Sequence, residues 1–94
     1  MSANLERLVE IALRDVLDPE IGRNVVDLGL IYAITAAPDG SIAITMTTTT
    51  RGCPLAGFLK EAVAMAAGAV EGVTGVTVTL TYEPAWVPAM IAAE

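Results

Sequence analysis

A chain of 94 residues with a net charge of −6 and no histidine is long enough for one domain, which we expect to span residues 1–94. Its five basic residues are too few to neutralise the phosphates of a nucleic acid, and the same acidity disfavours binding to anionic membranes. No apolar run is long enough to cross a membrane, and the first residues show no signal-type apolar region. Because the single cysteine cannot form an intramolecular disulfide, we expect a reducing, cytoplasmic setting.

Apolar residues recur at helical spacing near the start of the chain and predict a helix over about residues 4–17. We expect this helix to end near Asp18, because the residue before Pro19 is disfavoured in the helical region. The following stretch, DPEIGRNVVDLGL, is predicted to form a loop in which Gly22 and Gly29 permit tight backbone turns.

Two strands are predicted next, LIYAITAA at 30–37 and SIAITMTT at 41–48, with a PDG turn between them. Their apolar residues alternate, which predicts one face of each strand toward the core. The residues expected on that face are Leu30, Tyr32, Ile34, Ile42, Ile44 and Met46.

A second helix is predicted after Pro54, because apolar residues again recur at helical spacing until the stretch EGVTG ends the pattern. The stretch VTVTLTY at 76–82 alternates strictly and predicts a third strand. The remaining residues, EPAWVPAMIAAE, are interrupted by prolines and predict irregular structure.

The resulting order α-β-β-α-β indicates an α+β fold, a two-layer α/β sandwich with both helices on one face of a three-stranded sheet. A right-handed crossover through the second helix would make the second and third strands parallel, so the sheet would be mixed.

The other face of this sheet would carry only alanine and threonine. Its expected members are Ala33, Thr35, Ala43, Thr45, Thr47, Thr77, Thr79 and Thr81. One explanation is a solvent face, since threonine suits a pleated surface. The other, which we favour, is a surface covered by the C-terminal segment or by a second subunit, because uncharged strands left open invite pairing.

The stretch TMTTTTRGCP at 45–54 runs from the second strand into the second helix. Pro54 is typical of the first helical position, so Cys53 is the predicted N-cap. Backbone N–H groups and the helix dipole would then favour the thiolate, and we expect the pKa of Cys53 below the free value of roughly 8.5. Arg51 would add to this effect. The alternative is a small, buried and inert cysteine.

Asp18, Glu20 and Asp27 lie in one loop and are candidates for metal ligands or general bases, although capping and turn roles are the commoner use of such residues. Trp86 lies between two prolines, and its side chain is a candidate for packing against the hydrophobic core. Without histidine, the chain contains no Cys–His catalytic pair.

Three separated motifs, DPEIGRNVVDLGLIY, MTTTTRGCPL and VTVTLTYEPAWVPAM, resemble the MIP-eighteen-type family, also called domain of unknown function fifty-nine. This family includes SufT-like and PaaD-like proteins of metal–sulfur cluster biosynthesis, and the match runs from about Leu5 to Met90. The resemblance implies a fold like the C-terminal domain of NifU-type scaffolds and a role in assembling or delivering iron–sulfur clusters.

The motif residues of the family carry over to this chain directly. Its DPE motif falls on residues 18–20, its DLGL on residues 27–30, its threonine on Thr49 and its cysteine on Cys53. Thr48 stands where the family often has leucine, and Arg51 where proline is common. The resemblance also implies that the loop with Asp18 and Glu20 lies close to Cys53 and Thr49.

The sequence therefore predicts an assembly or delivery factor that is not an enzyme. Cys53 would contact iron or a cluster transiently, with Thr49, Asp18, Glu20, Asp27 and Arg51 around it. One thiol cannot hold a cluster alone, so we expect no stably bound cofactor. The expected partners are apo iron–sulfur client proteins or a cluster scaffold, and a homodimer would bring two thiols together.

Two other functions remain open. The first is a protein-interaction adaptor that docks client apoproteins through Trp86 and the threonine face, with a structural Cys53. The second and weaker one is an enzyme with Cys53 as the nucleophile.

Overall fold

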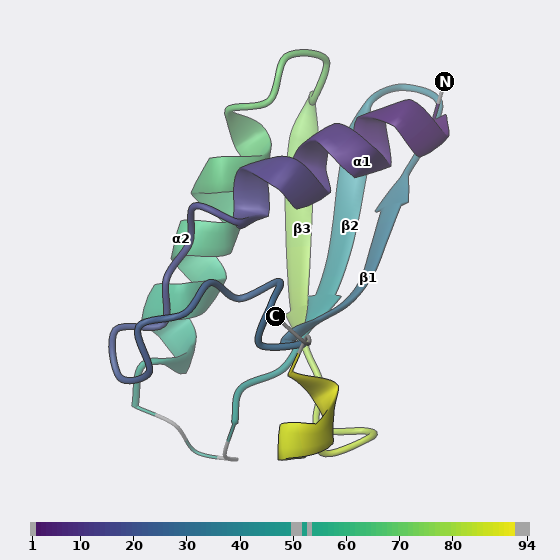
Figure 1. The fold of residues 1–94 in the computed structure, drawn as a ribbon. Helices are drawn as coiled ribbons and strands as arrows, with labels where there is room; N and C mark the ends of the chain where they lie inside the picture. The colour runs from purple at the N-terminus through teal and green to yellow at the C-terminus, as the bar shows by residue number, and fades with distance from the viewer. Residues whose placement is uncertain (1, 50–51, 53, 92–94) are drawn as a thin grey trace.

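The computed structural model of the chain describes residues 2–49, 52 and 54–91. These residues form two α-helices, one three-stranded sheet and a short 3₁₀-helix (Figure 1). In chain order the elements are α1 (Ser2–Leu13), β1 (Ile31–Ala36), β2 (Ser41–Met46), α2 (Ala56–Gly68), β3 (Gly75–Leu80) and η1 (Pro88–Met90). The order α-β-β-α-β confirms the predicted α+β class.

The sheet is mixed and has the strand order β1-β2-β3. β1 pairs antiparallel with β2, and β2 pairs parallel with β3, from Ser41 opposite Gly75 to Met46 opposite Leu80. The parallel pairing requires a crossover connection, which α2 provides. β2 and β3 therefore end at the same edge of the sheet, and the segment that leads to Cys53 starts there.

The turn between β1 and β2 is closed by local hydrogen bonds. Ala37 donates its N–H to the carbonyl oxygen of Ser41 at 2.9 Å, and Gly40 takes a φ of +93°. The carboxylate of Asp39 accepts the N–H of Ser41 at 2.9 Å and its hydroxyl at 2.7 Å. These two bonds, the backbone one foremost, lower the pKa of Asp39.

Both helices cover the same face of the sheet (Figure 1). One cluster of buried side chains joins the helices, the loop after α1 and all three strands. Its apolar members are Val9, Leu13, Val16, Val25, Leu28, Leu30, Ala36, Ile42, Ile44, Met46, Leu59, Val63, Ala67 and Val78. Each large side chain buried here stabilises the fold by about 1.5–3 kcal/mol.

The opposite face of the sheet is mostly open to solvent. Its exposed residues are Ala33, Thr35, Ala43, Thr77 and Thr79. Only the end nearest the C-terminal segment is shielded, where the half-buried Thr45 and Thr81 share a hollow with Pro84 and Met90. Thr47 was expected on this face but lies beyond the strand and is fully buried. Cover by a second subunit stays a prediction.

α1 is shorter than predicted and ends at Leu13 instead of Leu17. Beyond Leu13 the chain continues with bonds between residues three apart, such as Val16 N–H to the Leu13 carbonyl at 3.0 Å. The chain then extends, and Leu17 pairs with Asn24 in an antiparallel bridge. No helix within the described residues has the length and apolar character that crossing a membrane requires.

A bulge in β1 overturns the predicted alternation at Tyr32. Ile31 pairs with the buried Met46 and Ile34 with the buried Ile44, and the register shifts between Ile31 and Ala33. An extra residue in one strand moves the neighbouring side chains to the other face. Ile31 therefore takes the place in the core that was expected of Tyr32.

Candidate functional site

The candidate site is the segment between β2 and α2, residues 47–55, which we call the cysteine loop. Its first two residues are held firmly, since Thr47 is fully buried and Thr48 is 1% exposed. Thr47 donates its N–H to the Leu30 carbonyl at 2.9 Å, and the Thr48 hydroxyl lies 2.8 Å from the Tyr82 hydroxyl. The half-buried Thr49 follows. Cys53 and Arg51 lie outside the described residues.

The end of the cysteine loop differs from the predicted helix cap. α2 begins at Ala56 with Leu55 in the N-cap position, and Leu59 donates its N–H to the Leu55 carbonyl at 2.9 Å. Cys53 was predicted to be the N-cap, so that prediction is wrong. Gly52, in the same loop, has a φ of +80°, which suits glycine. The lowered pKa of the Cys53 thiol stays a prediction, and an N-cap position of Cys53 no longer supports it.

Asp18 has the turn role that was weighed against metal binding. It is 4% exposed, and its carboxylate accepts the N–H of Glu20 at 2.9 Å. Its carbonyl oxygen also accepts the N–H of Gly22 at 2.7 Å. A buried aspartate that bonds the backbone two residues ahead forms an Asx turn. Glu20 itself is exposed.

Asp27 is occupied by two partners from the same region. Asn24 donates its side-chain amide to Asp27 at 3.0 Å and accepts the Asp27 N–H at 2.8 Å. Arg14, just after α1, pairs with the Asp27 carboxylate at 3.3 Å. These contacts fix the loop to the end of α1, and the side chain that caps a backbone N–H here is that of Asn24, while the Asp27 carboxylate bonds the side chains of Asn24 and Arg14.

No metal site forms among the residues that the structure describes: they contain no group of three or more His, Cys, Asp or Glu side chains arranged to hold an ion. Figure 1 places the loop with Asp18 and the start of α2 at the lower end of the view, where β2 and β3 also end. That the loop with Asp18 and Glu20 lies close to Cys53 stays a prediction.

The DLGL stretch supports the C-terminal segment. Gly29 has a φ of +76°, and a Cβ at this position would collide with the backbone carbonyl of Met90. Glycine is therefore needed here both for its backbone conformation and for the close approach. Trp86 is half-buried and donates its indole N–H to the Leu28 carbonyl at 2.7 Å. Its predicted packing against the core is confirmed, whereas partner binding by Trp86 stays a prediction.

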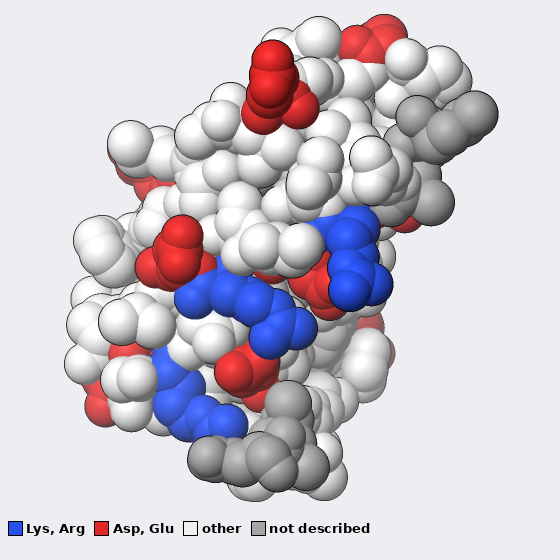
Figure 2. All heavy atoms as spheres, turned by 45° about the horizontal axis from the view of Figure 1, so that its top comes forward, with Lys and Arg blue, Asp and Glu red and all other residues white. Residues whose placement is uncertain are grey.

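Charged side chains of both signs are interspersed on the face drawn in Figure 2, where basic side chains lie among acidic ones. Among the described residues, this face shows no continuous basic area of the kind that binds nucleic acid. The expectation that nucleic acid is no partner therefore rests on charge composition and on this interspersed arrangement.

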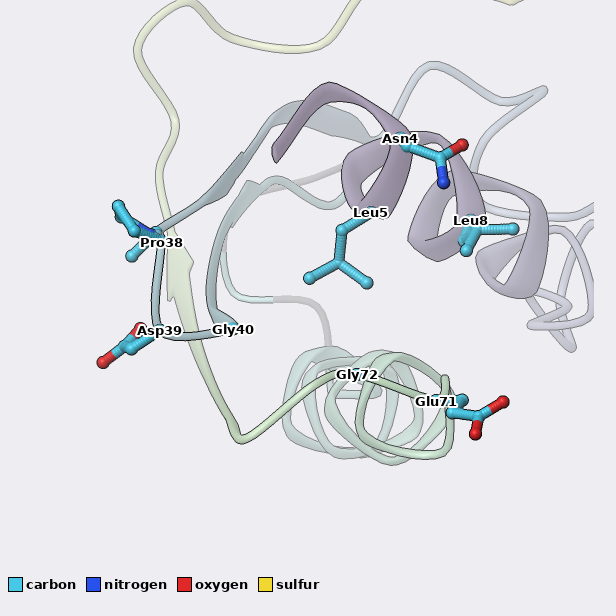
Figure 3. Close-up of a pocket in the computed structure, with 9 residues that line it drawn as sticks. Asn4, Leu5, Leu8, Pro38, Asp39, Gly40, Glu71 and Gly72 are labelled. Carbon is cyan, nitrogen blue, oxygen red and sulfur yellow. The ribbon is translucent and has the colours of Figure 1, made fainter. Parts of the chain in front are cut away.

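A hollow of about 530 Å³ lies at the other end of the sheet, between the start of α1, the β1–β2 turn and the α2–β3 connection. Figure 3 shows Leu5 pointing into it, while Asp39 and Glu71 point outward. β2 runs between this hollow and the cysteine loop, and six residues at roughly 3.3 Å each separate the two by about 20 Å. The hollow is therefore not part of the cysteine site.

Comparison with known proteins identifies the family. A family model described as "Iron-sulfur cluster assembly protein" matches residues 6–80. The chain belongs to this family. The resemblance inferred from the three motifs is thereby confirmed.

Relatives and a solved structure agree with that assignment. The chain is 49% identical over 82 residues to the "Fe-S protein maturation auxiliary factor" of Porphyromonas gingivalis, covering 87% of this chain and 78% of the relative. It is 40% identical over 75 residues to the auxiliary factor YitW of Bacillus subtilis, covering 80% and 74%. A crystal structure of a domain of unknown function fifty-nine from Bacillus anthracis superposes with a TM-score of 0.93 at 33% identity, covering 97% and 87%.

Sequence reasoning missed one contact at the site. Tyr82 was read as the end of the third strand, but β3 ends at Leu80 and the Tyr82 hydroxyl meets Thr48. A tyrosine at the end of a strand carries a polar tip that needs a partner when buried, and this was the available signal.

Proposed function

We propose that this protein assembles or delivers iron–sulfur clusters as a small carrier-type factor, with Cys53 as the transient contact for iron or a cluster. The observation that supports it most directly is the family, whose described role is iron–sulfur cluster assembly. The relatives are named maturation auxiliary factors, and these names describe a helper role for other proteins. We propose no catalytic turnover, and a cytoplasmic location in keeping with a single free cysteine.

The number of thiols limits how a cluster is held. Clusters are commonly held by four thiolates, and this chain has one cysteine. The remaining positions must come from a second copy, from a client apoprotein, from a scaffold or from small thiols. A cluster held in this way exchanges easily, which suits delivery to clients and excludes a permanent electron carrier.

The surroundings proposed for Cys53 are Thr49 and Arg51 from its own loop, with Asp18, Glu20 and Asp27 from the loop after α1. Asp18 and Asp27 are already engaged in the turn and the ion pair described above. We therefore propose that they fix the shape of the site and do not ligate iron. The exposed Glu20 is the carboxylate left to face an incoming ion.

An adaptor that docks client apoproteins is the second candidate, and one observation favours it. The open sheet face carries Ala33, Thr35, Ala43, Thr77 and Thr79 without any charge, so it suits contact with another protein or a second copy of this chain. In this function Cys53 would be structural and would not contact iron. A nucleophilic Cys53 is the weakest candidate, because the chain offers no histidine base.

Anaerobic reconstitution with ferrous iron and sulfide separates these functions. We expect sub-stoichiometric iron per chain that a chelator removes, and loss of this iron in Cys53→Ala. Met65→Ala is the matched control, because it removes another sulfur from a side chain that is 71% exposed on α2. Equal iron in Cys53→Ala and the unmodified protein would contradict the carrier function. Unchanged activation of a client apoprotein by Cys53→Ala would favour the adaptor.

A further inference from the structure

The C-terminal segment, residues 82–91, folds back along the end of the sheet as a strap. Three contacts fix it to residues 28–32. Trp86 donates to the Leu28 carbonyl, the Tyr32 hydroxyl donates to the Pro84 carbonyl at 2.8 Å, and the Met90 carbonyl lies against Gly29. In Figure 1 the strap is the yellow segment below the ends of β2 and β3.

The strap begins with a contact to the cysteine loop. The Tyr82 hydroxyl lies 2.8 Å from the hydroxyl of Thr48, which is 1% exposed. Thr48 is five residues before Cys53. On its other side Thr47 is bonded to Leu30, the last residue of the DLGL stretch. The start of the cysteine loop is thus held between the DLGL stretch and the strap.

We propose that Tyr82 is a positioning residue for the cysteine loop, through its hydrogen bond to Thr48. The strap holds Tyr82 in place, and Tyr82 fixes the point from which the loop leaves the sheet. The path of the loop toward Cys53 then depends on the C-terminal segment. In the sequence, Tyr82 lies 29 residues after Cys53. This inference deepens the proposed function, and its effect on iron rests on that function.

The contacts of the two tyrosines provide a matched pair of variants. Tyr82→Phe removes the hydroxyl that meets Thr48 and keeps the ring. Tyr32→Phe removes a hydroxyl that bonds the strap at Pro84 without contacting Thr48. Both variants lose a hydrogen bond of 2.8 Å, and Tyr32→Phe also loses the 3.6 Å contact with the Met90 sulfur. A larger effect of Tyr82→Phe would therefore report the position of the lost bond and not the loss alone.

The experiment measures the alkylation rate of Cys53, the only thiol, with iodoacetamide at one fixed pH. A lost hydrogen bond changes a local equilibrium by roughly 2- to 10-fold. We therefore expect Tyr82→Phe to speed alkylation by roughly that factor, and Tyr32→Phe, which acts only through the strap, to speed it distinctly less. Circular dichroism and the emission of Trp86, the only tryptophan, show whether the fold and the strap are intact.

Thr48→Val and the double variant complete the test. If the Tyr82–Thr48 bond carries the effect, Thr48→Val speeds alkylation by a similar factor and the double variant adds nothing further. A Tyr82→Phe rate equal to the parent rate would overturn the proposal. So would equal acceleration by Tyr32→Phe, or full additivity in the double variant.

Iron reconstitution of the same variants separates this proposal from the proposed function. Faster alkylation together with reduced iron in Tyr82→Phe supports both. Faster alkylation with no Cys53-dependent iron in the parent protein supports the positioning role and overturns the carrier function.

Discussion

The two ends of the sheet are built in different ways. At the β1–β2 turn, Asp39 bonds Ser41 two residues away, and Ala37 bonds Ser41 across the turn. At the end where β2 and β3 finish, the partners are distant in sequence. Thr48 meets Tyr82, 34 residues on, and Trp86 reaches back 58 residues to Leu28.

This difference separates a local structural turn from the candidate site. The β1–β2 turn is closed by bonds among its own residues, and its distant partner is Thr74, which donates to the carbonyl oxygens of Asp39 at 3.1 Å and Gly40 at 3.0 Å. The end with the cysteine loop depends on the DLGL stretch, the exit of β2 and the strap at the same time. Changes to the strap should therefore affect the site as well as stability, whereas changes to the turn should affect stability alone.

Gly29→Ala tests the distant end most severely. The substitution forces a non-glycine residue into a positive φ and drives its Cβ into the Met90 carbonyl. We expect a loss of about 3 kcal/mol or more of unfolding free energy, from backbone strain together with displacement of the strap. Urea unfolding measures the loss, and a red shift of Trp86 emission reports release of the strap.

Gly22→Ala is the matched control for Gly29→Ala. Gly22 has a similar φ of +81°, and a Cβ there meets nothing within 4 Å. It should cost only the strain, about 1–2 kcal/mol, without a shift in Trp86 emission. Equal losses in the two variants would show that the approach of Met90 to Gly29 contributes nothing.

The same contrast explains what the sequence could predict. The class α+β, the element order, the mixed sheet and the PDG turn all follow from periodicity and turn residues, which are local signals. The Asx turn at Asp18 also follows from local chemistry. The early end of α1 and the bulge at Tyr32 do not, because the pairing of Leu17 with Asn24 and of Ile31 with Met46 decides them.

The candidate site was predictable only in part. Its motif residues were identified by resemblance, and the position of the cysteine loop between strand and helix was correct. The N-cap at Leu55 was not foreseen, because Pro54 is also compatible with the turn that precedes α2. The Tyr82–Thr48 contact joins two segments that no periodic pattern relates, so only the folded structure could show it.

Trp86→Phe tests the strap with a smaller expected effect. It removes the indole N–H that bonds the Leu28 carbonyl and keeps most of the packing. We expect a loss of about 1–2 kcal/mol in unfolding free energy and faster Cys53 alkylation. Val87→Ala, at a side chain 47% exposed, should change both by little. A Trp86→Phe variant with parent-like alkylation would show that the strap does not control the loop.

Asn24→Ala tests the loop after α1, which also lies at the end of the sheet where the cysteine loop starts. Asn24 makes two hydrogen bonds to Asp27, so its loss should cost about 1 kcal/mol or somewhat more. Arg14→Ala removes only the ion pair, whose side chains are 52% and 35% exposed, and should cost less than about 1 kcal/mol. Thermal unfolding at low and high salt separates them, because only the arginine effect should shrink with salt. An equal and salt-dependent loss in both would contradict the hydrogen-bond role of Asn24.

Asp39→Asn tests the local end and should have the smallest effect. The Ser41 bonds lower the pKa of Asp39 in the folded protein, so the charged carboxylate favours folding. The resulting stability is present above the unfolded value of 3.8 and is lost as the pH falls through the lower folded pKa. The melting temperatures of the parent and Asp39→Asn should therefore differ slightly at neutral pH and converge in strong acid. Cys53 alkylation should be the same in both proteins, because β2 separates this turn from the cysteine loop. A change in alkylation as large as that of Tyr82→Phe would remove the distinction between the two ends of the sheet.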